Sequence, residues 1–179
     1  MRCFIAIPFP DAVKASLLDC MQQLQRQTQS ANLTRPENLH LTLAFLGETD
    51  RIAPIQAAMR AAAPDRPFSM ALAGSGCFQA LWWVGLQRNP ILIKLAERLQ
   101  NELRARGFSL ERRPFRPHIT IARQVESEAP ISLAVPSTSM LVDRICLMKS
   151  HRVADKLVYT PLYQNHFPNK QEGCKKDGI

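Results

Sequence analysis

We predict strands in seven segments, in which apolar residues either alternate with polar ones or form a short continuous run. Residues 39–46 alternate at first and then run apolar to a stop at Gly47, and residues 68–73 and 80–87 flank a turn containing Gly74 and Gly76. The seven predicted strands cover residues 2–8, 39–46, 68–73, 80–87, 117–123, 140–148 and 157–163.

Three further segments carry apolar residues at helical spacing. Residues 11–27 follow Pro10, and residues 51–62 begin after Thr49 or Asp50 as the expected N-cap. The third helix, at 91–106, has the clearest ends, because Asn89 is a good N-cap, Pro90 suits the first helical position and Gly107 supplies the stop.

The order of these elements predicts an α+β fold with signs of an internal duplication. In each half a helix precedes a strand whose second residue is histidine: 11–27 before 39–46, and 91–106 before 117–123. We expect a single bilobal domain over residues 1–167, in which two lobes face a shared cleft, and a flexible tail over residues 168–179.

One four-residue pattern occurs twice, as His40-Leu41-Thr42-Leu43 and as His118-Ile119-Thr120-Ile121. The chain has only four histidines, so the chance of this repetition is on the order of one in a hundred. In a strand, residues i and i+2 share a face, so each copy presents an imidazole and a hydroxyl together while its apolar residues face a core.

Two imidazoles facing one substrate favour acid–base chemistry near neutral pH, since one can be protonated while the other is neutral. Threonine hydroxyls can hold phosphoryl oxygens. A metal site is not predicted, because no His-x-x-x-His, Cys-x-x-Cys or clustered acidic motif accompanies either pattern. A single such motif would be interpreted as a structural histidine, which is how we interpret His151 and His166; the matched pair reverses that interpretation.

The net charge of +8 favours a polyanionic partner such as RNA, although a solvated basic face explains the charge equally well. Basic residues crowd the approach to the second motif: Arg98, Arg104, Arg106, Arg112, Arg113, Arg116 and Arg123. The apolar start suits a first strand better than a signal peptide, and no run is long enough to cross a membrane, so we expect a cytoplasmic protein. Five widely spaced cysteines fit reduced, buried thiols.

The chain resembles the 2H phosphoesterase superfamily, which is defined by paired His-x-Thr/Ser motifs, and within it the RNA 2′,3′-cyclic phosphodiesterase family, also called 2′–5′ RNA ligase. The resemblance covers roughly residues 1–165 and is carried by residues 2–7 (RCFIAI), 38–47 (NLHLTLAFLG), 113–123 (RPFRPHITIAR), 147–150 (LMKS) and 159–162 (YTPL). It implies two antiparallel-rich sheets related by a pseudo-two-fold, with helices outside and both motifs lining a central groove.

The resemblance also implies roles for individual residues. His40 would be the proton donor, His118 the proton acceptor, and Thr42, Thr120 and Arg123 the phosphate-binding groups. Strand alternation alone would turn Arg123 away from His118, so this role requires the strand to end, bulge or twist there.

We therefore predict a metal- and cofactor-free hydrolase that opens RNA 2′,3′-cyclic phosphates to 2′-phosphates. Expected partners are RNA ends, tRNA fragments among them, contacted by Arg112, Arg113 and Arg116, with no membrane and a monomeric state. The alternatives are 2′–5′ end joining by the same site, a non-catalytic RNA-binding module and, less favoured, a metallophosphatase. Alternation leaves open whether Trp82 or Trp83 stacks on a base, and core packing is favoured for both.

Overall fold

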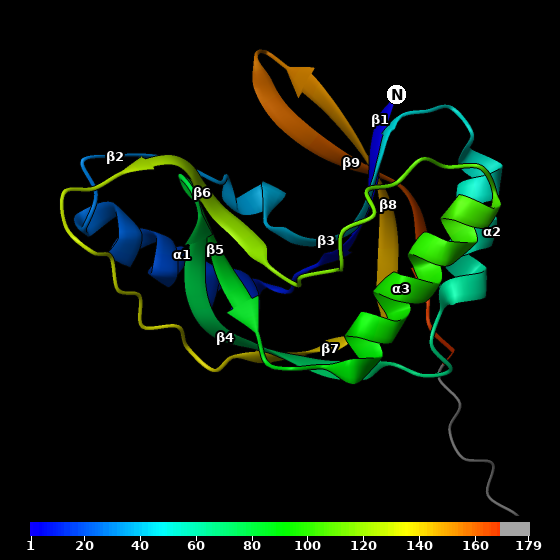
Figure 1. The fold of residues 1–179 in the computed structure, drawn as a ribbon, viewed down its shortest axis with the longest axis horizontal. Coiled ribbons are helices and arrows are strands. Elements are labelled where there is room, and N and C mark those ends of the chain that lie inside the picture. Colours follow the sequence, from blue (N-terminus) through cyan, green and yellow to red (C-terminus); the bar gives the residue numbers. More distant parts are fainter. Residues whose placement is uncertain (169–179) are drawn as a thin grey trace, which may run out of the picture.

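A computed structural model describes residues 1–168, and Figure 1 shows its arrangement. The predicted tail lies outside these residues apart from Pro168. The elements in chain order are β1 (Arg2–Pro8), α1 (Asp11–Arg26), β2 (Ser30–Leu33), the 3-10 helix η1 (Pro36–Asn38), β3 (His40–Glu48), α2 (Ile52–Ala62), β4 (Phe68–Phe78), β5 (Leu81–Leu86), α3 (Pro90–Ala105), β6 (Ile119–Glu126), β7 (Ser139–Val142), β8 (Arg144–Val153) and β9 (Lys156–His166).

The three predicted helices are confirmed to within about a residue at each end. The Asn89 side chain accepts a hydrogen bond from the Leu92 N–H at 3.1 Å, and Gly107 ends α3 with a φ of +80° that favours glycine. The predicted N-cap of α2 was wrong by one or two positions, because Arg51 occupies it. Thr49 instead accepts from the Arg51 N–H before the helix begins.

The strand predictions fail in three places. The turn predicted at Gly74 and Gly76 lies inside β4, where Gly74 (φ +66°) forms an irregularity, and the chain reverses at Gln79 instead. The predicted strand 140–148 is two strands, because β7 pairs with β4 in one sheet and β8 with β1 and β9 in the other. The short strand β2 was not predicted at all.

The strands form two antiparallel sheets, in the orders β3-β1-β8-β9 and β2-β6-β5-β4-β7. In each sheet the motif strand pairs with a strand that directly precedes a helix. β3 pairs with β1, which precedes α1, and β6 pairs with β5, which precedes α3. The helices that follow β1 and β5, α1 and α3, both have 16 residues. The α+β fold with two antiparallel sheets is thus confirmed, and the repeated order continues the duplication seen in the sequence.

Each of these two helices contacts the motif strand of the other half. Helix α1 contacts β6 and α3 contacts β3, while α2 packs beside α3 (Figure 1). Their apolar stripes lie in one continuous core that also includes Leu41, Leu43, Ile119 and Ile121, all nearly inaccessible to solvent. Because each helix packs against the motif strand of the other half, both motif strands border the same core. Among residues 1–168, no helix is long and apolar enough to cross a membrane.

Candidate functional site

The first motif occupies the start of β3, and a bulge shapes its far end. In the pairing with β1, Thr42 lies opposite Ala6 and Ala44 lies opposite Ile5, so Leu43 is an extra residue. Leu43 and Ala44 are consequently both buried, and Phe45, which simple alternation from Leu43 would bury, is 67% exposed.

The second motif repeats this bulge at the equivalent position of β6. Thr120 pairs with Trp83 and Ala122 pairs with Trp82, which leaves Ile121 as the extra residue. Ile121 and Ala122 are both buried, and Arg123 returns to the exposed face that carries Thr120. The bulge therefore places Arg123 on the same face as Thr120, whereas strand alternation alone would place it on the opposite face.

A groove with a volume of about 840 Å³ lies between β3, the end of β4, α3 and the loop that precedes β6. Thr42 and His118 both line it, as do the exposed aromatic rings of Phe45 and Phe78. Its remaining lining residues are Leu43, Ala44, Gln79, Gln100, Leu110, Glu111, Arg113, Pro114, Phe115 and Arg116. His40, Thr120 and Arg123 are not among the lining residues, although Nε2 of His40 lies 2.9 Å from Oγ1 of the lining residue Thr42.

Both imidazoles are held in the same way by the main chain. Nδ1 of His40 lies 2.6 Å from the carbonyl oxygen of Asn38, and Nδ1 of His118 lies 2.7 Å from that of Arg116. A carbonyl can only accept, so Nδ1 carries a proton in both rings and Nε2 is the nitrogen that gains or loses one. Nε2 of His118 makes no hydrogen bond to the described part of the chain.

Aromatic rings surround His40. The Phe4 ring centroid lies 4.8 Å from that of His40, and Tyr159 meets His40 edge-on at 5.2 Å. This burial lowers the pKa of His40 below its usual value; the contact with the Asn38 carbonyl opposes the shift and the positive charge of Arg123 adds to it. An anionic phosphate beside the ring would counter the lowering and favour the protonated imidazole.

His118 has a more open environment at the groove wall. The Phe78 ring meets it edge-on at 5.4 Å, and Phe78 also contacts Trp83 at 5.4 Å. Trp83 shares the face of its partner Thr120, with its ring against Gly76, whereas Trp82 packs against the core. Core packing thus describes Trp82 but not Trp83.

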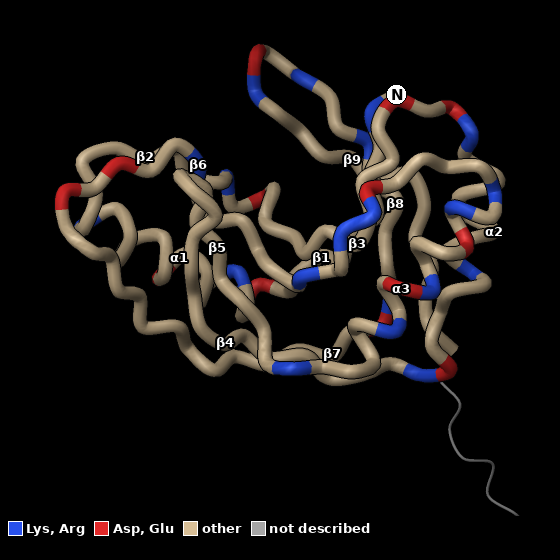
Figure 2. Tube along the Cα trace, in the orientation of Figure 1, with Lys and Arg blue, Asp and Glu red and all other residues tan. Residues whose placement is uncertain are grey.

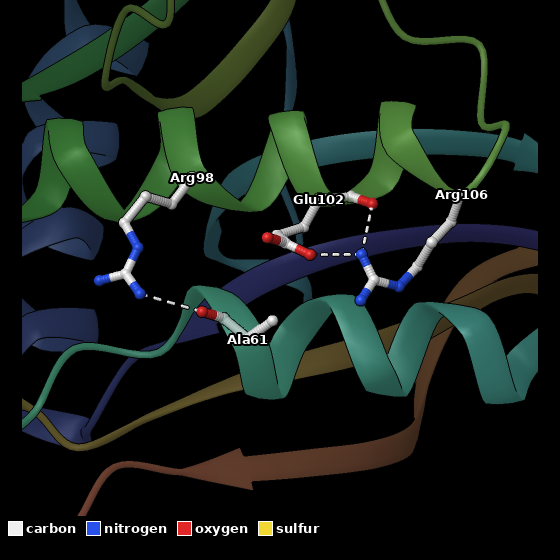
Figure 3. Close-up of polar contacts among 4 residues, drawn as sticks. All are labelled: Ala61, Arg98, Glu102 and Arg106. Atoms are coloured by element: carbon white, nitrogen blue, oxygen red, sulfur yellow. Dashed lines mark hydrogen bonds and ion pairs between the residues drawn. The ribbon is translucent and has the colours of Figure 1, made fainter.

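The run of arginines before the second motif divides into two groups. Arg112, Arg113 and Arg116 are exposed on the loop between α3 and β6, and Arg113 and Arg116 line the groove. Figure 2 marks the basic positions along this loop in blue. Arg98 and Arg104 of α3 and its C-cap residue Arg106 are instead engaged within the fold. Arg98 donates to the Ala61 carbonyl at 3.0 Å and Arg106 forms an ion pair with Glu102 (Figure 3), while Arg104 donates to the Glu111 carbonyl. The three arginines predicted to contact RNA, Arg112, Arg113 and Arg116, are thus the exposed group, and that role stays a prediction.

A potential metal site would need several ligating side chains close together. Within residues 1–168, no group of three His, Cys, Asp or Glu side chains is placed to hold an ion. The four cysteines of this part of the chain are free thiols: Cys3, Cys20, Cys77 and Cys146.

Comparison with known proteins matches residues 9–154 to the model of the 2′-5′ RNA ligase superfamily. The chain belongs to that superfamily. Among its curated relatives, the RNA 2′,3′-cyclic phosphodiesterase of Thermotoga maritima is 33% identical and is covered over 96% of its length. That of Geobacillus stearothermophilus is 35% identical over 90% of this chain, which spans only 54% of that longer protein.

Solved structures of the superfamily share the fold. Escherichia coli LigT complexed with 3′-AMP superposes with a TM-score of 0.80 at 26% identity, over 93% of this chain and 97% of LigT. The protein TT0787 of Thermus thermophilus gives a TM-score of 0.79 at 27% identity, over 96% of this chain and 100% of TT0787. The resemblance drawn from the motif residues is therefore confirmed.

Sequence reasoning missed the residues that surround His40 in this superfamily member. In the sequence, Phe4, Asn38 and Tyr159 are distinguished only as parts of the segments that match the family. A usable signal for Asn38 is its position, since the main-chain carbonyl two places before a motif histidine can accept from Nδ1 whatever the side chain. No sequence signal pairs Tyr159 with His40, because 119 residues separate them.

Proposed function

We propose that this protein hydrolyses terminal 2′,3′-cyclic phosphates of RNA to 2′-phosphates, using His40 and His118 as an acid–base pair. The observation that carries the proposal is the matched anchoring of the two imidazoles, which leaves Nε2 of each ring for proton transfer. The names of the curated relatives support the same substrate class.

In the reaction, Nε2 of His118 takes a proton from water as the water oxygen attacks phosphorus. The bond from phosphorus to O3′ breaks, and Nε2 of His40 gives its proton to O3′, so the phosphate stays on O2′. A new P–O bond replaces the broken one, and one proton enters as another leaves. Burial lowers the pKa of His40 in the free protein, and the bound anionic phosphate would counter this and favour the imidazolium that the step consumes.

Thr42, Thr120 and Arg123 hold the phosphoryl oxygens in this proposal. The Thr42 hydroxyl is hydrogen-bonded to Nε2 of His40, so it can hold a phosphoryl oxygen beside this imidazole. Arg123 lies near enough to His40 to lower its pKa, and its positive charge would stabilise the negative charge that develops on the phosphorane oxygens.

The RNA approaches along the loop that carries Arg112, Arg113 and Arg116, which would contact its phosphates. We propose residues 1–167 as one catalytic domain that acts as a monomer on RNA ends, with tRNA fragments as one candidate class. No cofactor or metal enters the proposed steps.

A product assay on an oligonucleotide with a 2′,3′-cyclic phosphate tests the proposal, with the 2′- and 3′-monophosphate products separated by chromatography. We expect 2′-phosphate, formed at the same rate with and without EDTA. A 3′-phosphate product would reverse the assigned roles, and loss of activity on chelation with recovery on added zinc or magnesium would rule out the metal-free route. Binding without turnover would instead indicate an RNA-binding module.

A second arm of the assay tests 2′–5′ end joining, for which the equivalence of the two anchored imidazoles provides a structural reason. An RNA with a free 5′-hydroxyl is added in excess, and a longer product resistant to 3′–5′-specific nuclease would indicate ligation. We expect hydrolysis to dominate in dilute solution, because water greatly exceeds the hydroxyl in concentration.

A further inference from the structure

Two polar residues of the described chain are buried, Asn38 and Asn165, and both are 7% exposed. Each donates its Nδ2–H to a main-chain carbonyl of a distant segment. Asn38 reaches Leu157 at 2.9 Å, and Asn165 reaches Met59 at 3.2 Å. The two residues make the same kind of contact, but only Asn38 adjoins a motif histidine.

Asn38 is bonded to the imidazole of His40 and to β9 at the same time. Its own carbonyl accepts from His40 Nδ1, while its side chain holds the Leu157 carbonyl in the outer half of the β8–β9 hairpin. Arg35 donates to the same Leu157 oxygen at 3.3 Å, so η1 and the residue before it are joined to the hairpin at two points. A shift of the hairpin would therefore move the carbonyl that orients His40.

The hairpin also supplies part of the cover over His40. Tyr159 follows Leu157 by two residues in β9 and packs edge-on against both His40 and Phe4, at 5.2 Å and 4.8 Å between ring centroids. Phe4 of β1 contacts His40 at 4.8 Å. The hairpin contact made by Asn38, at Leu157, thus lies two residues from the ring that covers His40.

We propose that Asn38 is a positioning residue, which docks the β8–β9 hairpin onto η1 and thereby fixes both the orientation of His40 and its exclusion from water. This inference rests on the proposed function only where it concerns catalysis, because the state of His40 can be measured without substrate. Without the amide of Asn38, the Leu157 carbonyl loses its closer partner and the imidazole gains water and freedom to rotate.

The direction of the effect on His40 follows from the groups around it. The charged or titratable groups near the ring are Arg123 from β6 and Tyr159 from β9, while β1 contributes Arg2, whose charge acts on Tyr159. Burial is the largest cause of the lowered pKa of His40. Opening the cover should therefore raise that pKa toward the ordinary histidine value, even if the contact with the Asn38 carbonyl weakens.

The test compares Asn38→Ala with Asn165→Ala in the full chain, since both remove a buried amide that donates to a distant carbonyl. His40 is titrated by NMR of its imidazole, and kcat and KM are measured on a dinucleotide 2′,3′-cyclic phosphate. We expect similar losses of thermal stability in both variants. Only Asn38→Ala should raise the His40 pKa and lower kcat, by about tenfold, with KM within about twofold. Asn38→Gln, which keeps the amide, should restore part of both.

Unchanged His40 titration in a folded Asn38→Ala variant, or equal shifts in Asn165→Ala, would overturn the proposal. A shifted titration in a protein that does not hydrolyse the cyclic phosphate would contradict the proposed function and leave the positioning role supported. If Asn38→Ala does not fold, Tyr159→Ala removes the hairpin's ring directly and should raise the His40 pKa, whereas Tyr159→Phe should not. An unshifted Tyr159→Ala would count against the proposal.

Discussion

The two motif strands carry the same four-residue pattern, the same bulge and the same carbonyl contact to Nδ1, yet they lie in different surroundings. β3 is an edge strand whose histidine is enclosed by Phe4 and Tyr159. β6 lies between β2 and β5, but its histidine follows an irregular loop rich in exposed arginines and faces the groove. The repeated unit thus leaves Nε2 of each ring for the proton transfer proposed above, and the surroundings of the two rings differ.

This difference suits a division of labour. An enclosed imidazole with a lowered pKa is a strong acid once charged, while an imidazole open to the groove can reach water as a base. Four measurements test whether the two halves differ in this way.

The largest effect is expected from removing either imidazole. His40→Ala and His118→Ala should each lower kcat by about 10²- to 10⁴-fold, because each removes one half of a concerted proton transfer. The double variant should be little worse than the single variants. Steady-state kinetics on a cyclic-phosphate dinucleotide measures this, and His166→Ala, at the exposed end of β9, serves as the control. Near-normal turnover by either single variant would remove that histidine from the mechanism.

Arg123 should affect turnover more than binding, because its charge acts beside the enclosed histidine. Arg123→Ala should lower kcat by about 10²-fold with a small change in KM. The matched control is Arg112→Ala, which removes an exposed arginine of the loop and should leave kcat on a dinucleotide unchanged. Equal effects of the two substitutions would show that Arg123 acts only through general charge.

The loop arginines should affect binding of longer RNA. Replacing Arg112 and Arg113 together with alanine should weaken binding and lower the slope of log affinity against log salt by about one for each phosphate that is no longer neutralised. Fluorescence anisotropy over a salt series measures the slope. Arg98→Ala, which removes a helix-to-helix hydrogen bond instead, should leave the slope unchanged. If the double substitution leaves the slope unchanged, the loop is a solvated basic surface that does not contact RNA phosphates.

The smallest effect concerns stability against pH. Because the folded-state pKa of His40 is below its unfolded value near 6.5, the unfolded chain binds more protons between these two values. The stabilising contribution of neutral His40 is therefore complete above about pH 6.5 and is lost as pH falls through the folded-state value. His40→Gln should show a smaller loss of unfolding free energy than the wild type between about pH 7.5 and about pH 5 in urea titrations. An identical loss in the two proteins would contradict the enclosure of His40.

Local patterns predicted much of this architecture. The end signals of α3 and the burial of Leu41, Leu43, Ile119 and Ile121 follow from residues close together in the chain. The motif histidines and the placement of His40 at the start of a strand also required only spacing, whereas His118, predicted inside a strand, lies one residue before β6. Their catalytic roles stay predictions, since the fold shows where the rings lie and not which proton moves.

Features that depend on partner strands could not be predicted in this way. The bulges at Leu43 and Ile121 exist only in register with β1 and β5, and they decide where Arg123 points. Asp143 separates β7 from β8, which belong to different sheets. The apolar residues on both sides of Asp143 predicted a single strand instead. The hydrogen bond between Asn38 and Leu157 joins segments whose proximity is a property of the whole fold.

The main-chain anchor of His118 has a consequence for how such a protein can diversify. Every amino acid supplies a carbonyl, so a substitution at Arg116 alters the groove wall without removing the group that fixes the proton on Nδ1. Mutation at this position can therefore change which RNA ends are preferred while the reactive tautomer is inherited intact. Only an insertion, a deletion or a displaced loop would disturb that tautomer.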